Sequence, residues 1–360
     1  MMYLRFRLAV FAATAALLFC GISAVAQTTP SADAPPPASD FPDTTQQNAR
    51  PTTTFKVSSN LVSIYFSARD KHNGLIPTLS RSDCSVFENK QPQTIKNFTA
   101  ETDLPLTLGI LLDTSGSQQY VLPIEQQSGD NFLREILRPK DEAFVVTFDV
   151  DVDLAQDFTN NVDLLTRALD HAEINTAGGN GAGGVPGIGQ GPFPTNGTPK
   201  GTLLYDAVAQ VSKEKLSTET GRKALILLTD GEDEGSITKP NQAIEAAQKA
   251  NAIVYVILIA DRAQYFQGPY IQTLGYTGDM QMQKLANATG GRVINVGHDG
   301  RKLQDAFDQI QRELRTQYLV SYVPKNTDMD GGFRRLDIAC KGDGVKVQAR
   351  KGYYAIADNQ

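Results

Sequence analysis

Histidine and cysteine are scarce in this chain, and their scarcity excludes several kinds of site. The 360 residues contain three of each. None of His72, His171 and His298 stands beside a candidate nucleophile, so the sequence does not indicate a Ser-His-Asp or Cys-His arrangement. It also lacks the kind of His/Cys cluster that binds zinc. We therefore expect a protein that is not an enzyme.

Nucleotide-binding motifs and basic stripes are absent as well. The glycines from Ala177 to Gly191 neither follow a strand as Gly-x-Gly-x-x-Gly nor end in Gly-Lys-Ser/Thr, which excludes the common dinucleotide and phosphate loops. The formal net charge is -6 and Lys and Arg do not cluster, which argues against a nucleic-acid partner. The composition, 41% hydrophobic and 21% charged, is that of an ordinary globular protein.

Long apolar runs are confined to the N-terminus. Two arginines precede an apolar run from Leu8 to Val25, and an Ala-x-Ala triplet ends at Ala26. This order predicts a signal peptide over residues 1–26. The alternative is an uncleaved membrane anchor, because about 18 apolar residues are just enough to span a bilayer. We expect cleavage, no transmembrane segment in the mature chain, and a periplasmic or secreted location.

Residues 27–54 have a different composition. They are rich in Pro, Ser and Thr and nearly free of large apolar side chains. Such a segment buries too little surface to offset the entropy lost on ordering. We expect a disordered tether.

Two segments, residues 55–100 and 317–360, alternate short β-rich runs with turn residues. This pattern predicts antiparallel strands. The expected strands are residues 61–66, 84–87, 95–98, 318–323, 333–340 and 345–354, with a hairpin loop at residues 88–92. Each set is too thin to be stable alone. We expect the two segments to pair into one small β-sandwich.

Between residues 104 and 316, apolar runs alternate with amphipathic stretches. This predicts a doubly wound, mainly parallel α/β sheet with helices on both faces. Polar and apolar residues alternate over 149–154, which predicts a hairpin and an antiparallel edge strand. The expected strands are residues 106–112, 143–148, 224–228, 253–259 and 292–296, and the expected helices are 123–137, 163–172, 203–216, 241–250, 280–288 and 301–314.

Cys84 and Cys340 are the cysteines left once the signal peptide is removed. A disulfide between them would persist in an exported protein. Each has the same strand parity as apolar neighbours, which places both on inward faces. Two separate buried cysteines that act as small apolar side chains are an equal alternative.

The apolar run at residues 106–112 ends abruptly in three oxygen-bearing side chains, Asp113, Ser115 and Ser117. A strand buried on both faces delivers them to its carboxyl end, where ligands bind in α/β sheets. Carboxylate and hydroxyl oxygens suit a hard cation such as Mg²⁺. The alternative is that the serines cap the next helix and Asp113 bonds to the turn.

A second buried run ends in the same way. Leu227-Leu-Thr-Asp230-Gly carries a carboxylate to the same edge of the sheet. Thr202 opens a helix directly after a Gly- and Pro-rich loop at residues 178–199. We expect Asp113, Asp230 and Thr202 to meet, because the carboxyl ends of parallel strands share one edge.

These five positions, Asp113-x-Ser115-x-Ser117, Thr202 and Asp230, resemble the metal-ion-dependent adhesion site of von Willebrand factor type A (VWA) domains. The resemblance covers residues 104–316. The flanking β-segments resemble those of VWFA-related acidobacterial proteins, through Glu88-Asn-Lys-Gln-Pro-Gln93 and Arg350-Lys-Gly-Tyr-Tyr354-Ala.

The resemblance implies that these five residues bind Mg²⁺ or Mn²⁺ and leave one position for a carboxylate from a protein partner. Two Asp charges for one divalent cation leave little repulsion against an incoming anion. The main hypothesis is therefore an exported protein that recognises a partner's Asp or Glu through the metal. The alternative is a structural cell-envelope protein whose metal site is vestigial.

Overall fold

The computed structural model describes residues 61–101, 104–175, 201–259 and 278–356, which belong to one compact unit. The signal peptide, the tether and the loop at residues 178–199 lie outside the described residues and stay predictions. Within the described ranges, no helix combines the length and apolar character needed to cross a membrane.

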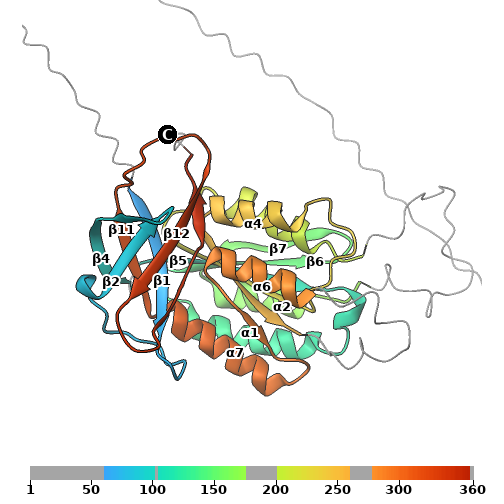
Figure 1. Cartoon of the computed structure of the whole chain (residues 1–360). Helices are drawn as coiled ribbons and strands as arrows, with labels where there is room; N and C mark the ends of the chain where they lie inside the picture. The colour runs from blue at the N-terminus through green and yellow to red at the C-terminus, as the bar shows by residue number, and fades with distance from the viewer. Residues whose placement is uncertain (1–60, 102–103, 176–200, 260–277, 357–360) are drawn as a thin grey trace, which may run out of the picture. The chain divides into compact units, whose positions relative to one another are not determined.

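A six-stranded sheet in the order β10-β9-β8-β5-β6-β7 forms the centre of the fold (Figure 1). Five strands are parallel, and β7 runs antiparallel to β6 at one edge. This confirms the predicted mainly parallel sheet with an antiparallel edge strand. The strands are β5 (Leu106–Asp113), β6 (Glu142–Phe148), β7 (Val152–Thr159), β8 (Arg222–Thr229), β9 (Ala252–Leu258) and β10 (Val293–Asn295).

Helices cover both faces of this sheet because its strands are apolar on both sides. In β5, Leu108 and Ile110 enter one hydrophobic core and Leu111 enters the other. The first core includes residues of α1 (Leu122–Ile136), α2 (Val162–Asp170) and α7 (Gly300–Leu314). The second includes residues of α3 (Leu204–Gln210), its π-helical continuation Val211–Leu216, α4 (Pro240–Lys249) and α6 (Gly278–Thr289).

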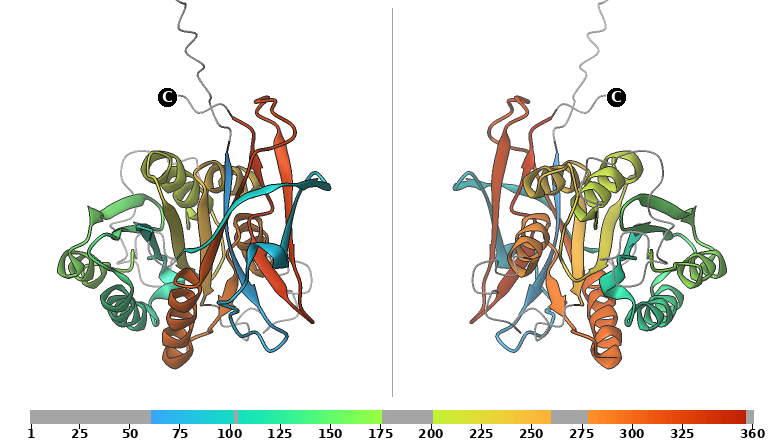
Figure 2. Two further views of the ribbon diagram at one scale, coloured as in Figure 1. Left: turned by 90° about the vertical axis from the view of Figure 1, so that its left-hand side faces the viewer. Right: turned by 90° about the vertical axis from the view of Figure 1, so that its right-hand side faces the viewer.

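The flanking segments form two four-stranded antiparallel sheets with a shared apolar core, as predicted. One sheet has the order β13-β1-β11-β4 and the other β14-β12-β2-β3. Figure 2 shows the N-terminal strand β1, in blue, beside C-terminal strands in red. The strands are β1 (Val62–Arg69), β2 (Cys84–Glu88), β3 (Gln91–Gln93), β4 (Ile95–Glu101), β11 (Gln317–Tyr322), β12 (Phe333–Cys340), β13 (Lys346–Ala349) and β14 (Gly352–Tyr354).

One local prediction in the sandwich was wrong, and the bounds of another are shorter in the structure. The predicted single strand at residues 345–354 is two strands, β13 and β14, which lie in different sheets. The chain changes sheets at Arg350, whose guanidinium donates to Ser63 O at 2.9 Å and Asn251 Oδ1 at 2.7 Å. The predicted loop at residues 88–92 is shorter, because Asn89 and Lys90 form the turn with positive φ and β3 starts at Gln91.

A disulfide joins the N-terminal and C-terminal segments of the sandwich. Cys84 and Cys340 are directly opposite each other in the antiparallel pair of β2 and β12, and the structure bonds their sulfurs. Cys84 belongs to the sandwich core. The cross-link therefore connects strands that are 256 residues apart in the sequence.

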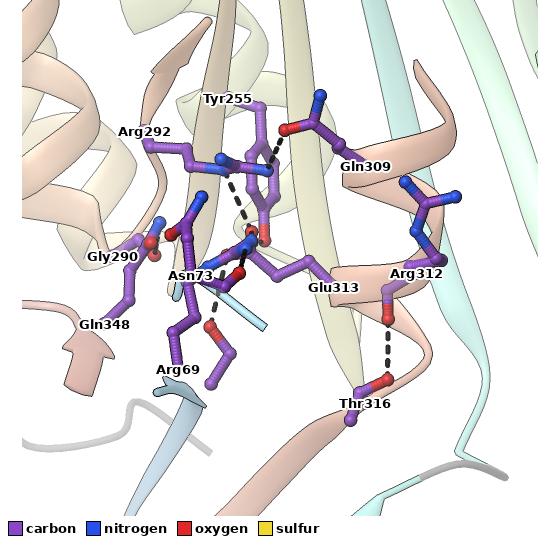
Figure 3. Close-up of polar contacts among 11 residues, drawn as sticks. Arg69, Asn73, Tyr255, Gly290, Arg292, Gln309, Arg312, Glu313, Thr316 and Gln348 are labelled. Atoms are coloured by element: carbon purple, nitrogen blue, oxygen red, sulfur yellow. Dashed lines mark hydrogen bonds and ion pairs between the residues drawn. The ribbon is translucent and has the colours of Figure 1, made fainter. Parts of the chain in front are cut away.

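A buried ion-pair network connects the sandwich to the α/β unit (Figure 3). Glu313, near the end of α7, pairs with Arg69 of β1 at 2.5 Å and with Arg292, just before β10, at 3.0 Å. Its other oxygen accepts hydrogen bonds from Tyr255 Oη and Ser67 Oγ, both at 3.2 Å. The Glu313 side chain is 1% exposed. One carboxylate thus holds β1, β9 and α7 together.

Candidate metal centre

Asp113 is the last residue of β5, at the point where the sheet reverses its strand order. The chain leaves β5 for β6 on one side and returns as β8 on the other. Such a switch point leaves room for a ligand at the carboxyl edge. The Asp113 side chain is fully buried. Its Oδ1 accepts from Ser115 N at 3.0 Å, and its Oδ2 accepts from Thr229 Oγ1 at 2.6 Å.

Ser115 and Ser117 lie in the short 3₁₀ turn that follows β5. Their Oγ atoms are 3.1 Å apart; Ser115 is half-buried and Ser117 is exposed. Thr114 fixes the turn to the next strand, because its N–H donates to Phe148 O at 3.0 Å and its hydroxyl donates to Asp149 Oδ2 at 2.6 Å. Both serine hydroxyls are therefore held in the loop directly after Asp113.

Asp230 follows β8 directly and is also buried. Its Oδ1 accepts from Glu232 N at 3.0 Å. The turn needs a glycine at the next position, because Gly231 has φ of +87°. β5 and β8 are paired neighbours in the sheet, so their ends bring the Asp113 and Asp230 carboxylates to one site.

Thr202 is buried and precedes α3. Its carbonyl accepts from Glu234 N at 3.0 Å, which ties it to the loop after β8. The next residue, Leu203, donates from its N–H to Asp149 O at 2.8 Å, which ties it to the loop after β6. The structure therefore places all five predicted ligand residues at one edge of the sheet, with Asp113 at the end of β5 and the other four in the loops beside it.

The electrostatics of the site fit a cation. Burial, and then the neighbouring charge of Asp230, raise the pKa of Asp113 to about 7. Among the described residues, no Lys or Arg forms an ion pair with Asp113. No three acidic, His or Cys side chains of the described chain gather as a metal-ligand set, so a cation here would also depend on hydroxyl and water oxygens. The donor set of two carboxylates and three hydroxyls suits Mg²⁺ or Mn²⁺.

The raised pKa of Asp113 predicts a pH dependence of the metal-free protein. Folded Asp113 keeps its proton up to about pH 7, whereas the unfolded residue loses it near 3.8. Between these values the folded state binds more protons, so the free energy of unfolding falls as the pH rises. In EDTA, we expect the melting temperature of wild type minus that of Asp113→Asn to decrease across this interval. A difference that is constant with pH would contradict the assignment.

Several residues of the site were not indicated by the sequence. Thr114 and Thr229 fix the two aspartate loops, and Asp149 links the first loop to the end of β6. Glu125 of α1 is a further buried carboxyl group, whose pKa is raised by burial and then by the charges of the same two aspartates. Its position carried a signal in the sequence, because an acidic residue stood on the apolar face of the predicted helix at residues 123–137.

Among known proteins, the chain is similar to solved structures. No protein-family model and no curated protein matches the chain. BatB from Bacteroides thetaiotaomicron, a conserved hypothetical protein, is 16% identical over 58% of this chain and 99% of that chain, with a TM-score of 0.42. The vWF domain of the type V pili tip protein Mfa5 from Porphyromonas gingivalis is 13% identical over 59% and 95%, with a TM-score of 0.39.

A third neighbour is proximal thread matrix protein 1 from the mussel byssus, in a structure with a zinc-occupied MIDAS motif. It is 14% identical over 62% of this chain and about half, 48%, of that chain, with a TM-score of 0.43. The strand order, the helices on both faces and the five motif positions at one carboxyl edge give the segment from β5 to α7 a VWA-like fold.

Proposed function

We propose that this chain is an exported binding protein whose site holds Mg²⁺ or Mn²⁺ and recognises a carboxylate of a protein partner through that cation. The observation that carries the proposal is the pair of buried aspartates at the ends of β5 and β8, with two serine hydroxyls in the loop after β5. Buried carboxylates without a cation are costly, because they lose hydration and repel each other.

The five motif residues have two kinds of role in this proposal. Asp113 and Asp230 supply two negative charges, which balance a divalent cation. Ser115, Ser117 and Thr202 supply neutral hydroxyl oxygens. When bound, the cation would attract an anionic oxygen, since the site around it carries no surplus negative charge from these five residues. Ser117 is exposed, which leaves the loop after β5 accessible to a partner.

We propose a binding role and not a hydrolytic one. In the described part of the chain, no histidine hydrogen-bonds to Asp113, Ser115 or Ser117, and Ser115 and Ser117 contact each other. A general base must reach the proton that it removes. No such base is identified here.

Cation binding is tested by thermal unfolding with and without Mg²⁺. We expect Mg²⁺ at 100 times its dissociation constant to stabilise the wild type by about 2.7 kcal/mol. Asp113→Asn should lose this stabilisation, because it removes one of the two charges. Asp170→Asn, at an exposed position at the end of α2, is the matched control and should respond like wild type. Retention of the Mg²⁺ response by Asp113→Asn would refute the site.

Partner recognition is tested by a pull-down from envelope extract with and without EDTA. We expect one protein to be captured by wild type in Mg²⁺ and to be lost with EDTA or with Asp230→Asn. Capture of the same protein under all conditions would remove the metal from the mechanism. Binding to cell-wall material that survives EDTA would instead favour the structural envelope role.

A further inference from the structure

Glu125 is a carboxylate buried next to the candidate metal centre. It lies in the first turn of α1, the helix that follows the Asp113–Ser117 loop. Its side chain is on the core-facing side of the helix, and the residue is 1% exposed. The residues of α1 that share this buried face are Leu122, Ser128, Gly129, Phe132, Leu133 and Ile136.

Both carboxylate oxygens of Glu125 lack a hydrogen-bond partner among the described residues. The other buried acidic residues differ. Glu313 is held by two arginines, Asp141 pairs with Arg315 at 2.9 Å, and Glu88 accepts from the hydroxyl of Tyr322 at 2.6 Å. Buried polar groups in proteins are almost always satisfied, so an orphaned pair of oxygens points to a place where a water or an ion binds.

Neither protonation state of Glu125 is satisfied by the described chain. An ionised carboxylate needs donors or a cation, and a neutral carboxyl needs an acceptor for its proton. Burial, and then the charges of Asp113 and Asp230, raise the pKa of Glu125 well above its ordinary value. The charges of both aspartates therefore act on Glu125.

Gln118, in the 3₁₀ turn after β5, is a second buried residue with an unsatisfied oxygen. It is 1% exposed, and its Oε1 also lacks a partner within the described ranges. Its Nε2 donates to Ser117 Oγ at 3.4 Å, so its side chain reaches the hydroxyl predicted to bind the cation. Two unsatisfied buried groups thus lie in the segment that begins at Asp113. Ordered water around a cation would supply partners for both.

We propose that Glu125 is a positioning residue of the cation site, where its carboxylate accepts hydrogen bonds from water on the cation and adds a third negative charge. This inference rests on the proposed function. We assign an outer role and not direct ligation, because the described acidic, His and Cys side chains do not form a three-member ligand set. Outer carboxylates orient the groups around a metal and strengthen its binding.

The third charge has a consequence for stability as well as for affinity. Without a cation, Glu125 and Asp113 are costly to bury at neutral pH, because each must either take up a proton or keep a charge that repels its neighbours. With a cation, the same charges attract it. Replacing Glu125 with a neutral isostere should therefore stabilise the metal-free protein and weaken the metal-bound one. A residue with a purely structural role would not reverse its effect in this way.

The test compares full-length wild type with Glu125→Gln, using calorimetric titration with Mg²⁺ and Mn²⁺ and thermal unfolding. We expect the affinity of Glu125→Gln to fall about 10- to 100-fold. In EDTA, this variant should melt above wild type, and the order should reverse as Mn²⁺ is added. Glu135→Gln, exposed on the same helix, is the control and should match wild type in both readouts.

Glu125→Met fills a similar space without polar atoms and should show the same loss of affinity. This second variant keeps the test decisive if Glu125→Gln does not fold. If Glu125→Gln and Glu125→Met bind the cations like wild type while Asp113→Asn does not, the role of Glu125 is refuted and the proposed site stands. If wild type itself binds neither cation, both the inference and the proposed function fail.

Discussion

Replacing Glu313 with glutamine is expected to lower the free energy of unfolding by about 3–5 kcal/mol, because it leaves buried arginine charges unpaired. Glu313 contacts both Arg69 and Arg292, and its oxygens also accept from the hydroxyls of Tyr255 and Ser67. An amide has one acceptor oxygen and no charge, so it satisfies only part of this network. Urea unfolding measures the loss.

A surface ion pair provides the matched control. Glu245 and Lys249 are 2.7 Å apart on α4, with side chains 40% and 44% exposed. Glu245→Gln should change the free energy of unfolding by no more than about 0.5 kcal/mol, since exposed helical pairs are screened by solvent. A similar small effect for Glu313→Gln would mean that water reaches the buried network and replaces the lost contacts.

Removing the disulfide is expected to cost about 2–5 kcal/mol. The bond closes a loop between Cys84 and Cys340, which are 256 residues apart, and so restricts the unfolded chain over most of its length. We expect the double variant Cys84→Ser/Cys340→Ser and the reduced wild type to unfold at the same, lower denaturant concentration. If reduction left the midpoint unchanged, the bond would not form in solution or would not restrict the unfolded chain.

The sequence predicted the α/β unit well because its signals are local. Each buried parallel strand is an apolar run, as in Leu106–Leu112, and each helix has an amphipathic repeat. The observed strand β5 contains the predicted strand and is one residue longer at its end, because it includes Asp113. The five motif positions were found for the same reason, because they stand at the ends of these local elements.

The sequence-based predictions were wrong or incomplete where contacts between distant residues decide the structure. No local pattern showed that the chain changes sheets at Arg350, which is held by Ser63 and Asn251 from distant parts of the sequence. Glu125 stood in the sequence as an acidic residue on an amphipathic helix, and only the fold buries it and exposes it to the charges of the two aspartates.

The sequence by itself determined which residues form the strands and helices and which oxygen-bearing side chains end two of the buried strands. Apolar periodicity and chain breaks are properties of neighbouring residues, so they can be read without a structure. Only the tertiary structure decided how Cys84 meets Cys340, how Glu313 joins the sandwich to α7, and how Glu125 comes to lie by Asp113 and Asp230. These depend on burial and on charges far apart in the chain, which exist only once the chain has folded.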